Sequence, residues 1–197
     1  MKDSGIDRGK RRFLVAATSV VGGVATAALA TPFVMSMLPS ERAKAAGAPV
    51  KADISKLEPG MEMTVTWRGK PVWVVNRTKE MLARLGDHND KLLDPNSNEP
   101  QQPPYCKNAT RSIKPEYMVA VGICTHLGCV PTYRPEMNAP DLPAHWPGGY
   151  LCPCHGSLYD LACRVYKDVP APLNLVIPPH KYLTDTMLLI GEDSKGA

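Results

Sequence analysis

The first forty positions divide sharply into a polar and an apolar part. Residues 13–38 (FLVAATSVVGGVATAALATPFVMSML) carry no charged side chain, whereas residues 1–12 are rich in Lys and Arg. At 1.5 Å per residue, a helix over residues 13–38 reaches about 39 Å, more than the roughly 30 Å core of a bilayer. The pattern therefore predicts a transmembrane helix over 13–38. The alternative is a cleaved secretory signal, for which the Ala-rich residues 43–48 resemble a cleavage site.

The flanks of this apolar run predict its orientation. The basic residues 10–12 precede it, and positive flanks stay in the cytoplasm. The rest of the chain is then expected across the membrane, in a bacterial periplasm. Residues 10–14 (KRRFL) also resemble a twin-arginine export signal. Residues 39–50 are small and polar and are broken by Gly47 and Pro49, which predicts a flexible tether.

From residue 51 onward the pattern changes to short strands. Residues 61–67 alternate, residues 71–75 form an apolar run, and residues 117–123 read as a buried strand. Further strands are expected at 149–151, 158–160, 164–166, 174–177 and 186–190. One short helix is expected over 77–85, ended by Gly86. Turns every eight to twelve residues predict an all-β domain over residues 51–197.

Composition limits the function. A chain of 197 residues has room for one globular domain and an appendage, and 20 Pro and 15 Gly suit a loop-rich β fold. Five basic and two acidic residues in 1–12 account for +3 of the net charge of +4. The remainder carries about +1, so no basic face for nucleic acid is indicated. Six Cys are too few for a disulfide scaffold and suit a cofactor site.

Two segments carry the chemistry: residues 124–129 (CTHLGC) and 152–157 (CPCHGS). Each offers a Cys and a His at close spacing, together with a second Cys. Two thiolates and two imidazoles are the ligands of a Rieske 2Fe–2S centre. A zinc site is the alternative, but it would use four of the six donors and leave Gly128, Gly156 and Ser157 unexplained. Structural disulfides alone would leave both His unexplained, so the pattern favours a cluster.

Both segments resemble, letter for letter, the Rieske iron–sulfur proteins, and more narrowly the subunit of ubiquinol–cytochrome c reductase (respiratory complex III). The resemblance implies a Rieske-type antiparallel β domain, with a cluster-binding part at about residues 120–172. The ligands that it implies are Cys124, His126, Cys152 and His155. It also implies a disulfide between Cys129 and Cys154 that ties the two loops together.

The same resemblance implies roles for the residues around the ligands. Ser157 and Tyr159 occupy the positions of hydrogen-bond donors to the cluster sulfurs, which raise the redox potential. His155 would hydrogen-bond the quinol hydroxyl, and His126 is the second exposed ligand. Leu127 is expected to shield the cluster and to pack against the docking site. Residues 169–172 (VPAP) resemble the family's proline loop, a stiff lid.

The function that the resemblance implies is electron transfer. The subunit would oxidise ubiquinol at the membrane quinol site and pass the electron to a c-type cytochrome, with release of protons. Its partners would be cytochrome b and cytochrome c1-type subunits in a dimeric complex in the bacterial inner membrane, and the tether would be the hinge of the moving head. The alternative is the Rieske subunit of another periplasmic oxidoreductase, such as an arsenite-oxidase-type enzyme.

The chain departs from the family pattern at Cys163, where the family usually has Gly, and Cys106 also lies outside the motif. Two interpretations stay open: a second bridge between these cysteines, or a small buried residue at 163 with a free thiol at 106. Three other histidines have no Cys or His at ligand spacing and are expected at the surface or in local hydrogen bonds: His88, His145 and His180.

Overall fold

The computed structural model describes residue 5 and residues 7–193. The chain forms two compact units, one up to residue 45 and one from residue 46 onward. Residues 1–4 and 6 of the predicted basic segment, and residues 194–197 of the predicted β domain, lie outside the described residues.

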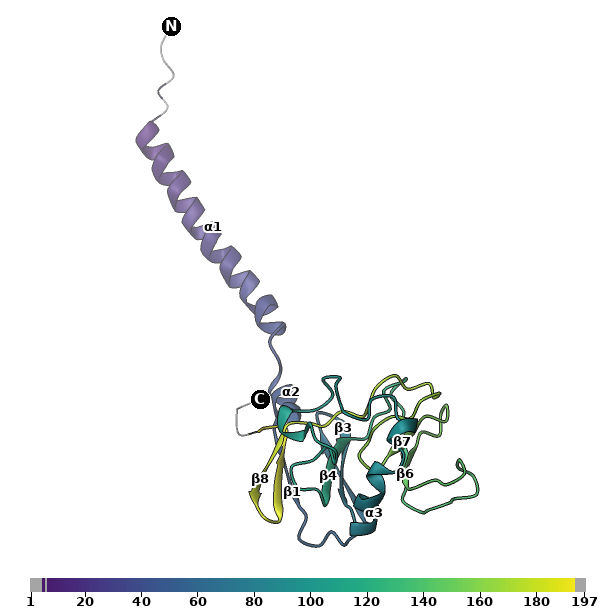
Figure 1. Ribbon diagram of the computed structural model, residues 1–197. Coiled ribbons are helices and arrows are strands. Elements are labelled where there is room, and N and C mark those ends of the chain that lie inside the picture. The colour runs from purple at the N-terminus through teal and green to yellow at the C-terminus, as the bar shows by residue number, and fades with distance from the viewer. Residues whose placement is uncertain (1–4, 6, 194–197) are drawn as a thin grey trace. The chain divides into compact units, whose positions relative to one another are not determined.

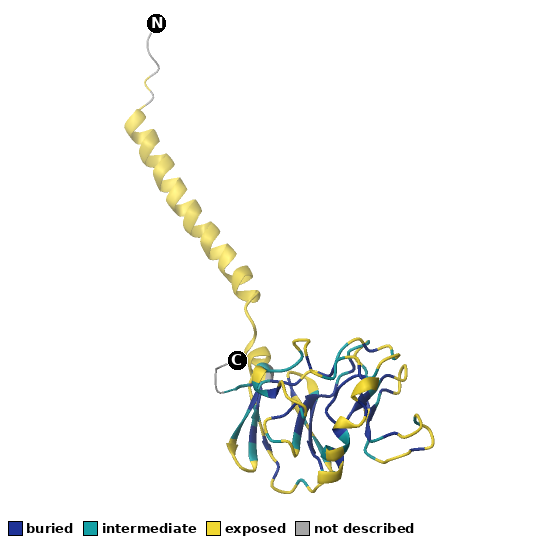
Figure 2. Cartoon of the chain, in the orientation of Figure 1, coloured by how far each residue is buried: buried dark blue, intermediate teal, exposed yellow. Residues whose placement is uncertain are grey.

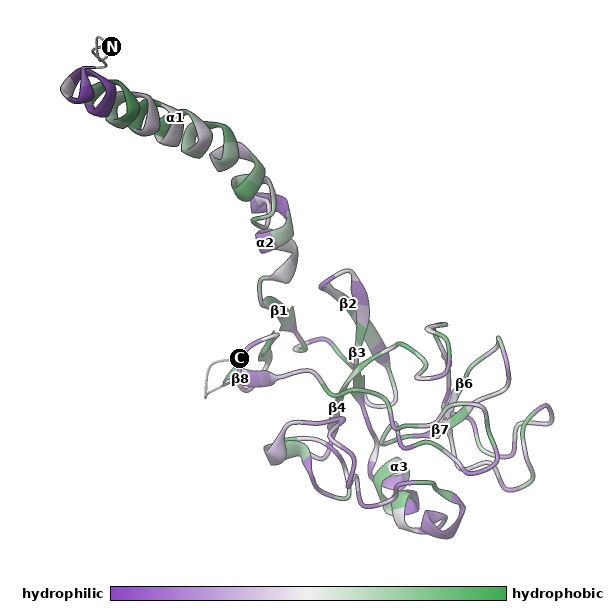
Figure 3. Cartoon of the chain, turned by 90° about the horizontal axis from the view of Figure 1, so that it is seen from above, coloured by the Kyte–Doolittle hydropathy of each residue, from purple (hydrophilic) through white to green (hydrophobic). Residues whose placement is uncertain are grey.

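The first unit is dominated by one long helix, α1 (Arg8–Ser36). Asp7 caps its start, because its carboxylate accepts hydrogen bonds from the amides of Gly9 and Lys10 at 3.0 and 3.1 Å. The helix is hydrophilic at its start and apolar along most of its length (Figure 3). All of its residues are exposed (Figure 2). The apolar helix predicted over 13–38 is confirmed as far as Ser36, and by length and composition it could cross a membrane.

Several hydroxyl groups of α1 donate to carbonyls within the helix. Thr18, Thr26 and Thr31 each donate to the carbonyl four residues earlier, at 2.7, 2.8 and 2.7 Å. A hydroxyl without a partner is costly in hydrocarbon, so these bonds suit a helix surrounded by lipid. A second, short helix, α2 (Glu41–Gly47), follows within the segment 39–50.

Among its described residues, the second unit contains three antiparallel sheets of three strands each, several of which are labelled in Figure 1. The first contains β1 (Val50–Asp53), β9 (Met187–Ile190) and β8 (His180–Thr184), in that order. The second contains β2 (Glu62–Trp67), β3 (Lys70–Asn76) and β4 (Tyr117–Val121). The third contains β5 (Thr132–Arg134), β6 (Gly149–Leu151) and β7 (Leu158–Asp160). The predicted all-β antiparallel class with one N-terminal helix is confirmed.

Strands β3 and β4 of the second sheet are buried on both faces, whereas β2 is half-exposed, and this explains why β3 reads as a continuous apolar run. Side chains alternate across a strand. Trp73 and Val75 therefore enter one core, together with Cys124 and Cys152, the first residues of the two predicted ligand loops. Val72 and Val74 enter the other, against β1 and β9. The Cys/His loops thus pack against one face of this sheet through Cys124 and Cys152.

Some sequence predictions are wrong in detail. Residues 164–166 form only isolated bridges, of Val165 with Tyr159 and of Tyr166 with Leu92. Residues 174–177 are not a strand, because the amides of Leu175 and Ile177 bond to single carbonyls outside any ladder. The predicted helix 77–85 is shorter, α3 (Lys79–Ala83), followed by a 3-10 turn at Arg84–Gly86. Strands β1, β5 and β8 were not predicted. Two more 3-10 turns lie at Asn89–Lys91 and Pro104–Cys106.

Candidate metal centre

The first Cys/His loop follows β4 and closes on itself through its own backbone. The Cys124 amide donates to the Cys129 carbonyl at 2.7 Å, and the Gly128 amide donates back to the Cys124 carbonyl at 3.1 Å. Gly128 has a φ of +84°, a conformation that favours glycine. The loop is therefore a tight turn whose first residue is a predicted ligand.

The second loop, between β6 and β7, repeats the same pattern. The Cys152 amide donates to the Ser157 carbonyl at 2.8 Å, and the Gly156 amide donates to the Cys152 carbonyl at 3.0 Å. Gly156 has a φ of +74°. Each loop thus uses a bond from residue i to i+5, a bond from i+4 to i, and a left-handed Gly at i+4. This repetition gives the glycines in both segments a physical reason.

The loops bring the predicted ligands together. Cys124 and Cys152 are buried, with 3% and 1% of their surfaces exposed. The rings of His126 and His155 lie with centroids 4.8 Å apart and are nearly perpendicular. His126 Nδ1 is buried and has no hydrogen-bond partner among the described residues, whereas His155 is exposed.

The side chain of Tyr159, in β7, contacts the first loop. Its hydroxyl accepts from the Thr125 amide at 3.2 Å and lies 3.2 Å from Cys124 Sγ. The hydroxyl accepts this amide hydrogen, so its own proton can point to the sulfur or to Thr125 Oγ1, which lies 3.3 Å away. Burial raises the pKa of the Cys124 thiol, but hydrogen bonds from Tyr159, from the His126 backbone and from neighbouring side chains bring it below its usual value. The thiolate that a metal needs is thereby favoured.

Ser157 has the same arrangement at the second loop. Its hydroxyl is fully buried and accepts from the Ala171 amide at 3.1 Å, so its proton is likewise free to be donated. The segment that contains Ala171 also holds the first loop, since Thr125 Oγ1 donates to the Leu173 carbonyl at 2.7 Å. The predicted proline loop, residues 169–172, is therefore joined to the second loop, and the next residue, Leu173, is joined to the first. Thr125 was not predicted, and no spacing rule in the sequence marks it.

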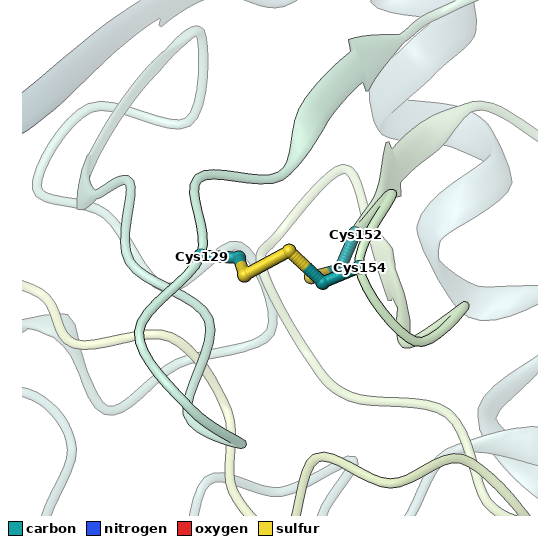
Figure 4. Close-up of side chains that lie close together, drawn as sticks. All are labelled: Cys129, Cys152 and Cys154. Atoms are coloured by element: carbon teal, nitrogen blue, oxygen red, sulfur yellow. A yellow bond between two sulfur atoms is a disulfide. The ribbon is translucent and has the colours of Figure 1, made fainter.

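A disulfide joins the loops, as predicted, between Cys129 and Cys154 (Figure 4). The Cα atoms lie 6.6 Å apart. The Cys152 sulfur lies within 4.8 Å of both disulfide sulfurs, so these three cysteines form a compact sulfur group. Two of the three are covalently paired, which leaves Cys152 as the member available to bind a metal.

The donor set fits a Rieske cluster. Two buried thiols, one of them with a lowered pKa, lie on the same two loops as two neighbouring imidazoles, and one imidazole has a buried nitrogen that lacks a hydrogen-bond partner among the described residues. A buried polar atom without a partner is uncommon in a folded protein, and a metal bond would satisfy it. Two sulfurs and two nitrogens are the ligands of a Rieske 2Fe–2S centre.

The hypothesis of a second bridge is wrong: Cys106 and Cys163 are free and buried. Burial raises the pKa of each thiol to about 12. Cys163 has a φ of +59°, which keeps the backbone conformation of the glycine usual at this position. Its side chain packs in the core under the loops. The alternative, a small buried residue at 163 and a free thiol at 106, is confirmed.

Of the three remaining histidines, two lie as expected and one does not. His145 is exposed, and His180 is buried with its Nδ1 2.8 Å from the Pro178 carbonyl, a local hydrogen bond as expected. His88 differs from the expectation, because it is buried against Tyr166 and lies 3.6 Å from Asp160. The polar sequence around it gave no sign of this long-range contact.

Comparison with known proteins identifies relatives of this chain. A family model described as "Ubiquitinol-cytochrome C reductase Fe-S subunit TAT signal" matches residues 1–40. The iron–sulfur subunit of ubiquinol–cytochrome c reductase from Allochromatium vinosum is 65% identical over 197 residues, which cover all of this chain and 95% of that protein. The subunit of the same name from Bradyrhizobium diazoefficiens is 38% identical and covers 92% of this chain and 94% of that protein.

A chain from a solved hyperthermophilic respiratory complex III covers 90% of this chain and 98% of its own length, with 28% identity and a TM-score of 0.49. The family itself rests on the sequence relatives, whose similarity extends over nearly their whole length. This chain belongs to the family of iron–sulfur subunits of ubiquinol–cytochrome c reductase.

Proposed function

We propose that this chain is the subunit that takes one electron from ubiquinol at the membrane quinol site and passes it to a c-type cytochrome. Its partners are then cytochrome b and a cytochrome c1-type subunit. The observation that carries the proposal is the meeting of two buried thiols and two neighbouring imidazoles on matched loops. The arsenite-oxidase-type alternative is not favoured, because the relatives bear the ubiquinol–cytochrome c reductase name.

In this proposal Cys124, Cys152, His126 and His155 hold a Rieske 2Fe–2S cluster. When bound, the cluster supplies a one-electron acceptor with a potential of about −150 to +300 mV, because two neutral imidazoles replace two anionic thiolates. The residues of the chain then position it. The Tyr159 hydroxyl lies 3.2 Å from Cys124 Sγ, and its proton, like that of Ser157, is free to stabilise added negative charge.

In this proposal the imidazoles of His126 and His155 take part in the proton transfer from the quinol. His155 is exposed, so its ring can hydrogen-bond a quinol hydroxyl from outside. With Nδ1 of His126 buried, the other ring nitrogen, Nε2, is the atom that exchanges a proton. Leu127, which is 71% exposed, offers an apolar contact beside His126 to the docking site. Such an exposed apolar side chain suits a surface that must bind a partner.

We also propose that α1 is the membrane anchor, with the basic side at the cytoplasm and the β domain in the periplasm. Residues 39–50 then form the tether between anchor and head. A twin-arginine signal fits this direction, since export of a folded chain preserves a cluster that was assembled in the cytoplasm.

The ligand assignment is tested by changing one donor at a time in the full-length chain. His155→Ala, His126→Ala and Cys124→Ala are each expected to abolish the 2Fe–2S EPR signal and the bound iron. Cys106→Ala removes a buried free thiol outside both loops and serves as the matched control, which keeps both. An unchanged signal in any of the three ligand variants would refute the assignment of that residue.

A further inference from the structure

The start of α1, which is hydrophilic in Figure 3, carries three arginines on one face. Arg8, Arg11 and Arg12 line a hollow of about 550 Å³ together with Val15 and Ala16. Their spacing (i, i+3, i+4, i+7 and i+8) is the one that places residues on a single face of a helix. The proposed electron transfer uses none of these residues, and a twin-arginine signal accounts for Arg11 and Arg12 but not for Arg8.

The three guanidinium groups are free to bind a ligand. All three side chains are exposed, and none has a hydrogen bond or a salt bridge to a residue that the structure describes. The acidic residue closest to them in the sequence is Asp7, whose carboxylate accepts from the amides of Gly9 and Lys10. This carboxylate therefore caps the helix, and the arginines keep their donors available.

The chemistry of this face indicates what kind of ligand it binds. Arg has several N–H donors and no acceptor atom, and its planar fork matches two oxygens of a phosphate group. Val15 and Ala16 continue the same face one turn later, with side chains that contain no polar atom. A ligand that fits the whole face therefore has a phosphate at one end and a hydrocarbon part at the other.

The depth of this face in a membrane indicates the same ligand, a step that rests on the proposed role of α1 as the membrane anchor. The charge-free run begins at Phe13, directly after Arg12. The arginines then lie at the level of the lipid headgroups, and Val15 and Ala16 lie at the upper part of the acyl chains. Anionic lipids attract such basic groups at the cytoplasmic surface.

We propose that this face binds an anionic phospholipid of the phosphatidylglycerol type in the cytoplasmic leaflet. Arg8, Arg11 and Arg12 donate to its phosphate oxygens, and Val15 and Ala16 contact its acyl chains. Lys10 is outside the site. It lies two residues from Arg8, which places it on the opposite side of the helix, and it does not line the hollow.

The test uses the full-length protein, purified in detergent and reconstituted into phosphatidylcholine vesicles with a trace of spin-labelled lipid. The EPR spectrum of the label separates lipid held at the protein from free lipid. The parent is expected to hold spin-labelled phosphatidylglycerol in preference to spin-labelled phosphatidylcholine. Arg8→Gln should reduce this preference about fivefold, the contribution of one basic residue near an anionic surface.

Lys10→Gln is the matched control, because it removes one positive charge at the same depth but from the opposite side of the helix. It should keep the preference of the parent. Reconstitution starts from purified protein, so the comparison does not depend on export. The 2Fe–2S EPR signal checks that each chain is folded, and resistance to extraction from the vesicles by alkaline carbonate checks that α1 is inserted.

The carbonate step separates this proposal from the one on which it rests. If the parent is extracted, α1 is not an anchor and both proposals fail. If the parent stays inserted but shows no preference for phosphatidylglycerol, the lipid site alone is overturned. Equal losses in Arg8→Gln and Lys10→Gln would also overturn it, because they would mean attraction by overall charge.

A last comparison distinguishes a lipid from a free anion. If about 10 mM inorganic phosphate removes the preference and sodium chloride of equal ionic strength does not, the arginines bind free phosphate, and the lipid proposal is wrong. Equal effects of the two salts are expected, since both then act only by screening the charges.

Discussion

The two Cys/His loops have the same backbone hydrogen bonds but are held in different ways. The first loop is tied from below by side chains: Tyr159 contacts Cys124 and Thr125, and Thr125 reaches the Leu173 carbonyl. In the second loop, residues 153–156 are exposed, and this loop depends on the disulfide and on Ser157. The first loop therefore has more side-chain support, whereas the second closes the β6–β7 hairpin and has the disulfide and Ser157 as its further ties.

This difference matches the proposed division of labour. The loop with His155 must meet a substrate, and a loop with few buried contacts leaves its imidazole accessible. The loop with Cys124 holds the thiol that Tyr159 contacts at 3.2 Å, so it is the place where hydrogen bonding can adjust the potential. The same backbone turn is thus used in both loops, and the side chains around it make one loop accessible to substrate and let the other adjust the potential.

The largest effect is expected from removing the link between the loops. Cys129→Ala/Cys154→Ala opens a closed segment with a sequence separation of 25 and should reduce the free energy of unfolding by about 3–4 kcal/mol. The second loop should lose its position first, because it has fewer side-chain supports. Denaturant unfolding measures the loss, and the EPR signal reports the cluster. Cys106→Ala is the control, and equal stability of the double variant and this control would contradict the asymmetry.

The sequence predicts the features that are determined by neighbouring residues, and it does not predict those that depend on residues far apart in the chain. The charge-free run of α1 and the apolar run of β3 follow from the nearest residues, as does the left-handed Gly of each loop. The support of the first loop does not, because Thr125 and Leu173 are far apart in sequence and meet only in the folded domain. The same holds for His88, whose burial depends on Asp160 and Tyr166.

The wrong strand assignments have a related cause. Residues 164–166 and 174–177 have strand-like apolar patterns, but their backbone groups bond to scattered partners, such as the Asn174 side chain on the Val165 amide. The side chain of Arg164, in turn, reaches the carbonyls of Leu85 and Pro95. Buried Arg contacts of this kind hold a segment in place without a sheet ladder. They leave no periodic signal in the sequence. Pattern therefore predicts regular elements well and side-chain-supported segments poorly.

A smaller effect is expected on the potential, and it distinguishes the two hydroxyls. Tyr159→Phe and Ser157→Ala should each lower the midpoint potential by roughly 60–130 mV, the value of a hydrogen bond of about 1.5–3 kcal/mol to a charged group. Tyr159→Phe should also destabilise the first loop, because the Thr125 amide loses its acceptor. Redox titration of the purified chain measures the first effect, and thermal unfolding measures the second.

The matched control for these variants is Tyr182→Phe, which removes a hydroxyl from β8, outside both loops. Its potential should equal that of the parent. If Tyr159→Phe keeps the parent potential as well, the hydroxyl does not donate to the Cys124 sulfur, and the proposed adjustment through the first loop is wrong.

The smallest effect should be the same in both loops. Gly128 and Gly156 have positive φ, and a Cβ built at either one has no atom within 4 Å, so the cost of Ala is backbone strain alone. That cost is about 1 kcal/mol in each case. Gly69→Ala, at φ +71° in equally open space between β2 and β3, should cost the same and is the control for stability.

Cys163 at φ +59° shows that this chain accepts a side chain in such a conformation. Chemical denaturation compares the three variants. If Gly156→Ala costs much more than Gly128→Ala, the two turns differ in their backbones, and not only in the side chains that support them.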